Sequence, residues 1–167
     1  IDGASVKVDS LSPVLTDSLG RFTVTNLTLG SHQLLVTKNG LTNLSQTVNL
    51  TASTGSIDFT MSDLIAPAVP TNFNVANVAP TTSKQRVSWN SVNDYSGIKL
   101  YRVVRILNGT IVQTVTTSAL SIDFDGLLPS TQYSYKIQAE DNAIPANPGA
   151  WSAEIGLATI QLPMATW

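Results

Sequence analysis

The sequence predicts an all-β protein made of two tandem immunoglobulin-like β-sandwiches joined by a short proline-containing linker. Apolar and polar residues alternate with a period of two in short stretches bounded by glycine, proline, asparagine or aspartate. No long segment shows the three- and four-residue apolar spacing of a helix. Roughly five strands fit the first part of the chain and about seven the second, at the spacing typical of β-sandwiches.

The composition excludes several classes of function. Charged residues make up 12% of the 167 residues and the net charge is -2, so no strong field attracts nucleic acid or an anionic membrane. The chain has no cysteine and one histidine, which excludes thiolate chemistry and multi-histidine metal sites. No run of 18 apolar residues is present. We therefore expect no cofactor, no metal, no nucleic-acid partner and no membrane insertion.

Five strands are expected in a first domain at residues 1–62. Ala4, Val6 and Val8 share one face of the first strand, and a turn at residues 16–20 leads to a second alternating stretch at residues 22–24. The third strand carries His32 on its inner face, and Asn39 with Gly40 predicts a tight turn, because both residues tolerate positive φ. The last two strands carry the inward residues Val48, Leu50, Ile57, Phe59 and Met61.

Residues 63–70 are expected to form the linker, and residues 71–160 the second domain. Pro67 and Pro70 fix φ and favour extended neighbours, so the linker should be short and stiff. The seven strands of the second domain are expected around residues 73–75, 87–89, 100–105, 110–115, 122–124, 133–139 and 155–159, with a tight turn at Asn108 and Gly109.

Several motifs occur together in residues 67–160, among them Val87-Ser88-Trp89-Asn90, Tyr101-Arg102-Val103, Ala139-Glu140-Asp141 and Trp151-Ser152. This part of the chain resembles a fibronectin type III domain of the kind common in bacterial secreted enzymes. The resemblance implies that Trp89 is a core residue. It also implies a tyrosine corner, in which the Tyr133 hydroxyl bonds back to the preceding loop.

Residues 1–62 carry Gly3-Ala4-Ser5-Val6, then a turn ending in Gly20-Arg21-Phe22, then Leu29-Gly30-Ser31-His32. They resemble a carboxypeptidase-regulatory-like domain, related in fold to transthyretin. In that family a strand precedes the Gly-Ala-Ser-Val element, and here that first strand is missing. A sheet that lacks an edge strand leaves backbone groups and part of its core open.

The C-terminal tail, residues 161–167, offers one way to fill that place. Ile160, Leu162 and Met164 alternate with polar residues or proline, and Trp167 follows. Two explanations stay open: the chain is a piece of a larger modular protein, or the tail pairs as a strand with the first domain of another copy.

Candidate chemistry is sparse, and we expect no enzyme activity. No Gly-x-Ser-x-Gly motif accompanies His32, whose inward strand position predicts a packed, hydrogen-bonded side chain. The acidic pairs Asp123 with Asp125 and Glu140 with Asp141 are expected at solvated strand ends. Tyr95 and Trp151 are candidate sugar-contacting aromatics. Four Asn-x-Ser/Thr sequons are candidate glycosylation sites: Asn26, Asn43, Asn49 and Asn108.

These observations favour a non-catalytic structural or assembly module of an extracellular or cell-surface protein. Such a module is a spacer, a stalk or a filament subunit, and its partners are copies of itself or neighbouring modules of a longer chain. Two alternatives remain. One is an accessory spacer or carbohydrate-binding module of a secreted polysaccharide-degrading enzyme or protease, with polysaccharide as partner. The other is an adhesin module.

Overall fold

The computed structural model describes residues 1–52, 56–79 and 83–161, and it is all-β: these residues form antiparallel strands and no α-helix. The chain divides into two compact units, residues 1–65 (unit 1) and residues 66–167 (unit 2). The point of division lies inside the segment 63–70. Among the described residues no helix is long and apolar enough to cross a membrane.

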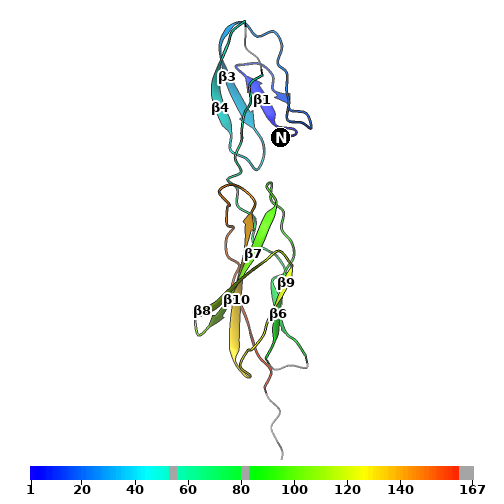
Figure 1. Ribbon diagram of the computed structural model, residues 1–167, viewed down its shortest axis with the longest axis vertical. Coiled ribbons are helices and arrows are strands. Elements are labelled where there is room, and N and C mark those ends of the chain that lie inside the picture. The colour runs from blue at the N-terminus through cyan, green and yellow to red at the C-terminus, as the bar shows by residue number, and fades with distance from the viewer. Residues whose placement is uncertain (53–55, 80–82, 162–167) are drawn as a thin grey trace, which may run out of the picture. The chain divides into compact units, whose positions relative to one another are not determined.

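Unit 1 is built on one four-stranded antiparallel sheet with the order β2-β1-β3-β4. Its strands are β1 (Ser5–Val8), β2 (Val14–Leu15), β3 (Gly30–Thr37) and β4 (Leu44–Leu50) (Figure 1). Alternate residues of β1 and β3 are buried, as the period of two predicts. The buried centre of the unit consists of Ala4, Val6, Val8, Leu34, Val36 and Val48.

Two of the strands expected in unit 1 do not form. Residues 22–24 and 57–61 run without a ladder partner among the described residues, although their apolar side chains alternate and pack against the core. Alternation specifies which face of a segment is buried but not which neighbour accepts its hydrogen bonds, and the described residues include no ladder partner for either segment. The short strand β2, which pairs with β1, was not expected from the sequence.

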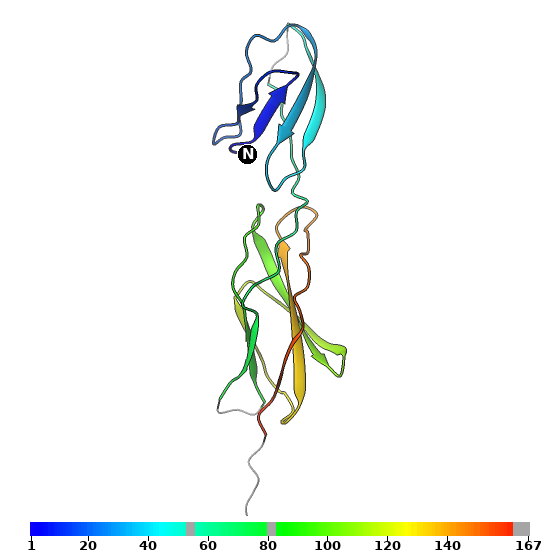
Figure 2. The same cartoon turned by 180° about the vertical axis from the view of Figure 1, so that it is seen from behind.

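Unit 2 is a sandwich of two antiparallel sheets, with strand orders β11-β10-β7-β8 and β5-β6-β9 (Figure 2). Each of the seven expected strands has a counterpart among the described residues: β5 (Asn74–Asn77), β6 (Gln85–Ser88), β7 (Ile98–Leu107), β8 (Thr110–Thr117), β9 (Ser121–Phe124), β10 (Gln132–Asp141) and β11 (Ile155–Ala158). The long central pair of β7 and β10 supplies the inner face of the larger sheet.

The core of unit 2 is rich in aromatic residues. The Trp89 and Tyr101 ring centroids lie 5.4 Å apart, and those of Phe124 and Tyr135 lie 5.0 Å apart. Both sheets contribute to this cluster, since Val87 and Phe124 come from the smaller sheet and Tyr135 from the larger. Side chains from facing layers that interdigitate in this way hold a sandwich closed.

Candidate functional site

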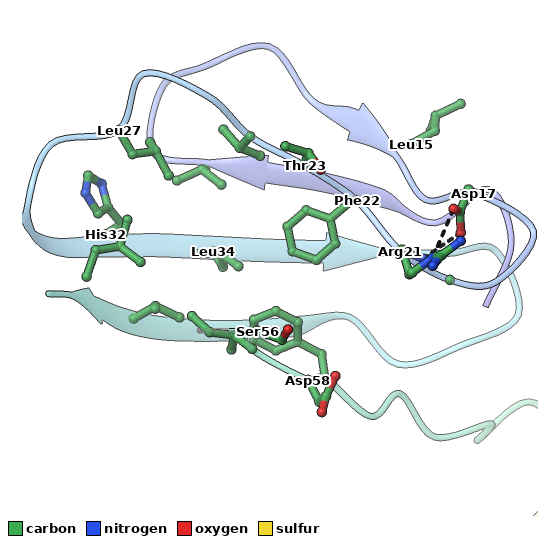
Figure 3. Close-up of a pocket in the computed structure, with 17 residues that line it drawn as sticks. Leu15, Asp17, Arg21, Phe22, Thr23, Leu27, His32, Leu34, Ser56 and Asp58 are labelled. Carbon is green, nitrogen blue, oxygen red and sulfur yellow. Dashed lines mark hydrogen bonds and ion pairs between the residues drawn. The ribbon is translucent and has the colours of Figure 1, made fainter. Parts of the chain in front are cut away.

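A groove with a volume of about 890 Å³ lies in unit 1. Its floor includes Val8, Leu34 and Val48 from the core face of the sheet. Its walls come from the two segments that form no strand ladder. Residues 21–24 line one side and residues 56–59 line the other. The Phe22 and Phe59 ring centroids are 6.2 Å apart. We call this feature the unit 1 groove (Figure 3).

Charged residues line the groove at Asp17 and Arg21, which lie at one end, and at Asp58, which lies on the 56–59 wall (Figure 3). The Asp17 carboxylate accepts hydrogen bonds from the backbone N–H groups of Leu19 and Arg21, at 2.9 and 2.8 Å, and pairs with the Arg21 guanidinium at 3.4 Å. The Arg21 N–H is the main cause that lowers the pKa of Asp17 below its usual value. Asp17 thus stabilises the turn in which it lies, and neither Asp17 nor Arg21 is part of the groove floor.

His32 lies at the other end of the groove, near Leu27 (Figure 3). It is buried and hydrogen-bonded, as its inward position predicts. Its Nδ1 is 2.7 Å from the Asp9 carboxylate and its Nε2 is 2.9 Å from the Thr28 carbonyl oxygen. The Asp9 carboxylate is the main cause that raises the pKa of His32. Since both ring nitrogens have acceptors, His32 ties β3 to two loops.

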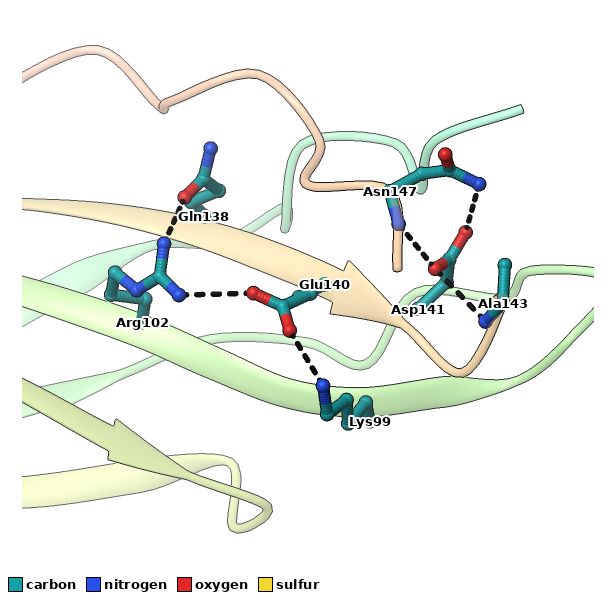
Figure 4. A network of polar contacts seen from close by, with 7 residues as sticks. All are labelled: Lys99, Arg102, Gln138, Glu140, Asp141, Ala143 and Asn147. Carbon is teal, nitrogen blue, oxygen red and sulfur yellow. Dashed lines mark hydrogen bonds and ion pairs between the residues drawn. The ribbon is translucent and has the colours of Figure 1, made fainter. Parts of the chain in front are cut away.

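Most acidic candidates of unit 2 form ion pairs on its surface. The Arg86 Nε lies 2.6 Å from Asp123, and the Lys84 ammonium lies 3.0 Å from Asp125. Glu140 on β10 pairs with Lys99 at 3.0 Å and with Arg102 at 2.9 Å (Figure 4). Opposite charges on neighbouring strands attract one another, so Glu140 pairs with two of the three positive side chains of β7. The third, Arg105, lies over the rings of Phe124 and Tyr133.

Asp141 departs from expectation. The sequence predicts a solvated strand end, but Asp141 is 0% exposed. Its carboxylate accepts hydrogen bonds from the backbone N–H groups of Ala143 and Asn147 and from the Asn147 side-chain amide (Figure 4). The loop that follows β10 folds back over the carboxylate and removes it from solvent. Asp141 is therefore a loop-organising residue, which spacing along the chain does not reveal.

The two candidate sugar-contacting aromatics are both exposed. Tyr95 is 48% exposed and Trp151 is 37% exposed. Tyr95 precedes β7, and Trp151 lies in the segment between β10 and β11. An exposed ring face is what stacking on a sugar requires.

The four sequon asparagines are also exposed. Asn26 and Asn43 lie outside the ladders of unit 1, Asn49 lies on β4, and Asn108 lies in the β7–β8 turn. Glycosylation at these sites stays a prediction, since exposure is a condition for it and not a demonstration.

Only the start of the tail lies within the described residues. Ile160 is 41% exposed, and its carbonyl oxygen accepts a hydrogen bond from the Ser130 N–H at 3.5 Å. Leu162, Met164 and Trp167 lie outside the described residues. Ile160 thus marks the point where the chain leaves the last strand of unit 2.

One buried polar cluster of unit 2 has no signature in the sequence. Gln85 is fully buried, and its side-chain oxygen accepts a hydrogen bond from the Tyr135 hydroxyl at 2.8 Å. Its side-chain amide N–H groups donate hydrogen bonds to the Asn77 side chain and the Leu157 carbonyl oxygen. Burial is the main cause that raises the pKa of Tyr135 to about 12. The cluster links the two sheets, and its partners are too distant in sequence for a local pattern to indicate it.

Two features of unit 2 match what the type III resemblance implies. Trp89 is buried in the core. The Tyr133 hydroxyl accepts a hydrogen bond from the Leu128 N–H at 3.2 Å, which closes the tyrosine corner. Both predictions are confirmed.

Known proteins are similar to this chain in sequence. A gellan lyase of a Bacillus species is 39% identical over 75 residues, which are 45% of this chain and 3% of that protein. Chitinase A1 of Niallia circulans is 30% identical over 154 residues, 87% of this chain and 20% of that protein. The chain thus spans a fifth or less of the length of these two relatives.

The fold of unit 2 has counterparts among solved structures. The crystal structure of FN3tt superposes with a TM-score of 0.51 and 19% identity, over 59% of this chain and 99% of that chain. At this identity the likeness concerns the fold alone. The fibronectin type III domain model matches residues 68–152, just over half of the sequence. The chain therefore belongs to the fibronectin type III family.

Proposed function

We propose that the chain is a non-catalytic spacer module of an extracellular protein that degrades polysaccharide. The observation that carries the proposal is the sequence similarity of this chain to a gellan lyase and a chitinase, each much longer than this chain. A fibronectin type III domain is typically a non-catalytic module. The greater length of such relatives leaves room for catalysis elsewhere.

The structure of unit 2 suits this role. Its core is closed by two sheets, and Arg86 and Arg102 pair with acidic residues of neighbouring strands. A unit of this kind holds its shape and occupies a fixed length of chain without presenting reactive groups. The resemblance of residues 1–62 to carboxypeptidase-regulatory-like domains, which stays a prediction, is consistent with a row of such modules.

Activity assays test the proposal directly. The purified chain is incubated with chitin, gellan and carboxymethylcellulose, and released sugar ends are measured against buffer. The proposal predicts no release above buffer on any of the three. Release that depends on the chain and survives repeated purification would contradict it.

A second candidate function, binding of polysaccharide, is favoured by the exposure of Tyr95 and Trp151. Sedimentation with insoluble chitin separates it from a spacer role. A spacer stays in the supernatant. A binding module is retained, and Trp151→Ala reduces its retention several-fold while the control Leu128→Ala, at another exposed apolar residue, does not.

A further inference from the structure

The second layer of unit 1 is incomplete. Residues 22–27 and 57–61 lie opposite the four-stranded sheet and bury alternate apolar side chains against it. Within the described part of the chain, no backbone hydrogen bond involves the amides of residues 22–27 or 57–61. An extended segment with open N–H and C=O groups is a template for a further strand.

The unit 1 groove lies between these two segments. Its volume of about 890 Å³ lies in the range of pockets that enclose whole ligands. Val8, Leu34 and Val48 make its floor apolar, and the walls have no backbone–backbone hydrogen bonds at residues 22–24 and 57–59. A ligand that covers the apolar floor needs apolar side chains on one face. To form hydrogen bonds with both walls, it also needs a backbone with N–H and C=O groups along both edges. An extended polypeptide strand has both properties.

The charge of the groove restricts the sequence of that strand. The Asp17–Arg21 pair lies at one end and His32, already bonded to Asp9, at the other. Asp58 on the 56–59 wall also lines the groove, but it is exposed. The floor itself carries no charged residue, so a charged side chain on the inward face of the ligand would be buried there without a partner. The ligand strand should be uncharged, with apolar residues at every second position.

This chain contains a segment that fits. Residues 160–167 have no charged side chain and place Ile160, Leu162 and Met164 at a period of two. The seven residues after Ile160 span about 23 Å when extended, and the six residues of the 22–27 wall span about 20 Å. Pro163 occupies the alternate, outward position, where it removes a single ladder hydrogen bond.

We propose that the unit 1 groove binds residues 161–167 of a second copy of this chain as an inserted strand. Leu162 and Met164 of the donor then lie on the floor formed by Val8, Leu34 and Val48, and the donor backbone pairs with both walls. Because each copy has one groove and one tail, the contact is head-to-tail and generates open chains of copies. The proposal goes beyond the spacer role and does not depend on it.

Light scattering over a range of concentrations tests the donor. The intact chain is expected to form species that are multiples of 17.7 kDa and grow with concentration. Deletion of residues 161–167, or the double substitution Leu162→Ser with Met164→Ser, is expected to leave monomer. The control double substitution Ile111→Ser with Val112→Ser, at exposed apolar positions on β8, should assemble as the intact chain does. An intact chain that stays monomeric, or assemblies that persist after the deletion, would overturn the proposal.

A synthetic peptide tests the acceptor in a protein that is folded and monomeric. A peptide of residues 159–167 is titrated into the chain that lacks residues 161–167, and amide signals of unit 1 are followed by nuclear magnetic resonance. The proposal predicts saturable one-to-one binding with changes at residues 22–27 and 57–61, and at least tenfold weaker binding of the peptide with Leu162→Ser. Equal binding of both peptides, or changes confined to unit 2, would contradict it.

Disulfide trapping tests the register, and the absence of native cysteine makes the result unambiguous. Thr23 is exposed on one wall, and Ala165 is at an outward position of the donor, so the two side chains are expected on the same face. A Thr23→Cys chain mixed with an Ala165→Cys chain should give a mixed disulfide. The control pair, Thr114→Cys on β8 with Ala165→Cys, should give little. Equal yields from both pairs would refute the assigned groove.

Discussion

The Tyr133 hydroxyl ties the loop before β10 to the core of unit 2 through the Leu128 N–H. Removing it by Tyr133→Phe leaves that N–H without its partner at a part-buried site. We expect the substitution to lower the free energy of unfolding of unit 2 by about 1 kcal/mol. Urea unfolding followed by tryptophan fluorescence measures this, because all three tryptophans belong to unit 2.

Tyr95→Phe is the matched control, because it removes the same atom from an exposed side chain. Its unfolding midpoint should equal that of the unsubstituted chain. Equal losses from both substitutions would show that the tyrosine corner does not stabilise the unit.

His32 and Asp9 give unit 1 a dependence on pH. The hydrogen bond with Asp9 raises the pKa of His32 above 6.5, so its contribution to stability is complete below pH 6.5 and declines as the pH rises through the raised value. The hydrogen bond with His32 lowers the pKa of Asp9 below 3.8, so that contribution is present above pH 3.8 and declines as the pH falls below it.

We therefore expect the thermal midpoint of unit 1 to be higher at pH 5.5 than at pH 8.5, measured on amide signals of β3. His32→Gln should remove most of that difference, while Lys7→Gln, at an exposed position on β1, should keep it. A midpoint that rises from pH 5.5 to 8.5 in the intact chain would contradict the assignment.

Single residues differ in how far the sequence reveals their role. The buried positions of His32 and Trp89 follow from alternation and from the type III motifs, and the structure confirms both. The burial of Asp141 could not be predicted, because it depends on the 142–148 loop folding back over the carboxylate. A strand-end aspartate is solvated in most contexts, and only tertiary structure reverses that preference.

At the scale of elements, the β7–β8 hairpin follows from two residues. Asn108 and Gly109 have φ of 51° and 76°, the left-handed pair required by a two-residue hairpin turn. A Cβ at Gly109 would meet nothing within 4 Å, so the effect of Gly109→Ala is purely conformational. We expect it to destabilise unit 2 by about 1 kcal/mol in urea unfolding.

Asn108→Gly provides the control for the turn, because glycine adopts positive φ freely. It should change the midpoint far less than Gly109→Ala. A Gly109→Ala midpoint equal to that of the unsubstituted chain would exclude the turn geometry described above.

The two units differ in how much of their pairing the sequence could predict. In unit 2, alternation and turn residues located all seven strands among the described residues. In unit 1, the same signal at residues 22–24 and 57–61 predicted two strands that lack a ladder. Alternation indicates that one face of a segment is buried, and both segments have such a face. A β-strand also needs a neighbouring strand for its backbone hydrogen bonds, and alternation does not indicate whether that neighbour exists.

At the scale of the whole molecule, the two units differ in how their cores are covered. Two hydrogen-bonded sheets enclose the core of unit 2, whereas one sheet and two segments without a ladder cover the core of unit 1. Unit 2 contains the residues that match the fibronectin type III family, and we propose that it acts as a spacer. Unit 1 contains a groove whose wall segments belong to no strand ladder, and we propose that a strand from another copy binds there. The proposal of an inserted strand depends on the walls of the unit 1 groove lacking hydrogen-bonded partners within the chain itself.

Hydrogen–deuterium exchange of the dilute chain, resolved to single amides, measures that property most directly. We expect the amides of residues 22–27 and 57–61 to exchange at nearly the rate of an unstructured peptide, while the amides of β3, which has neighbours on both sides, are strongly protected. Protection of the wall amides equal to that of β3 in the dilute monomer would show that the chain pairs them itself, and would contradict the open unit 1.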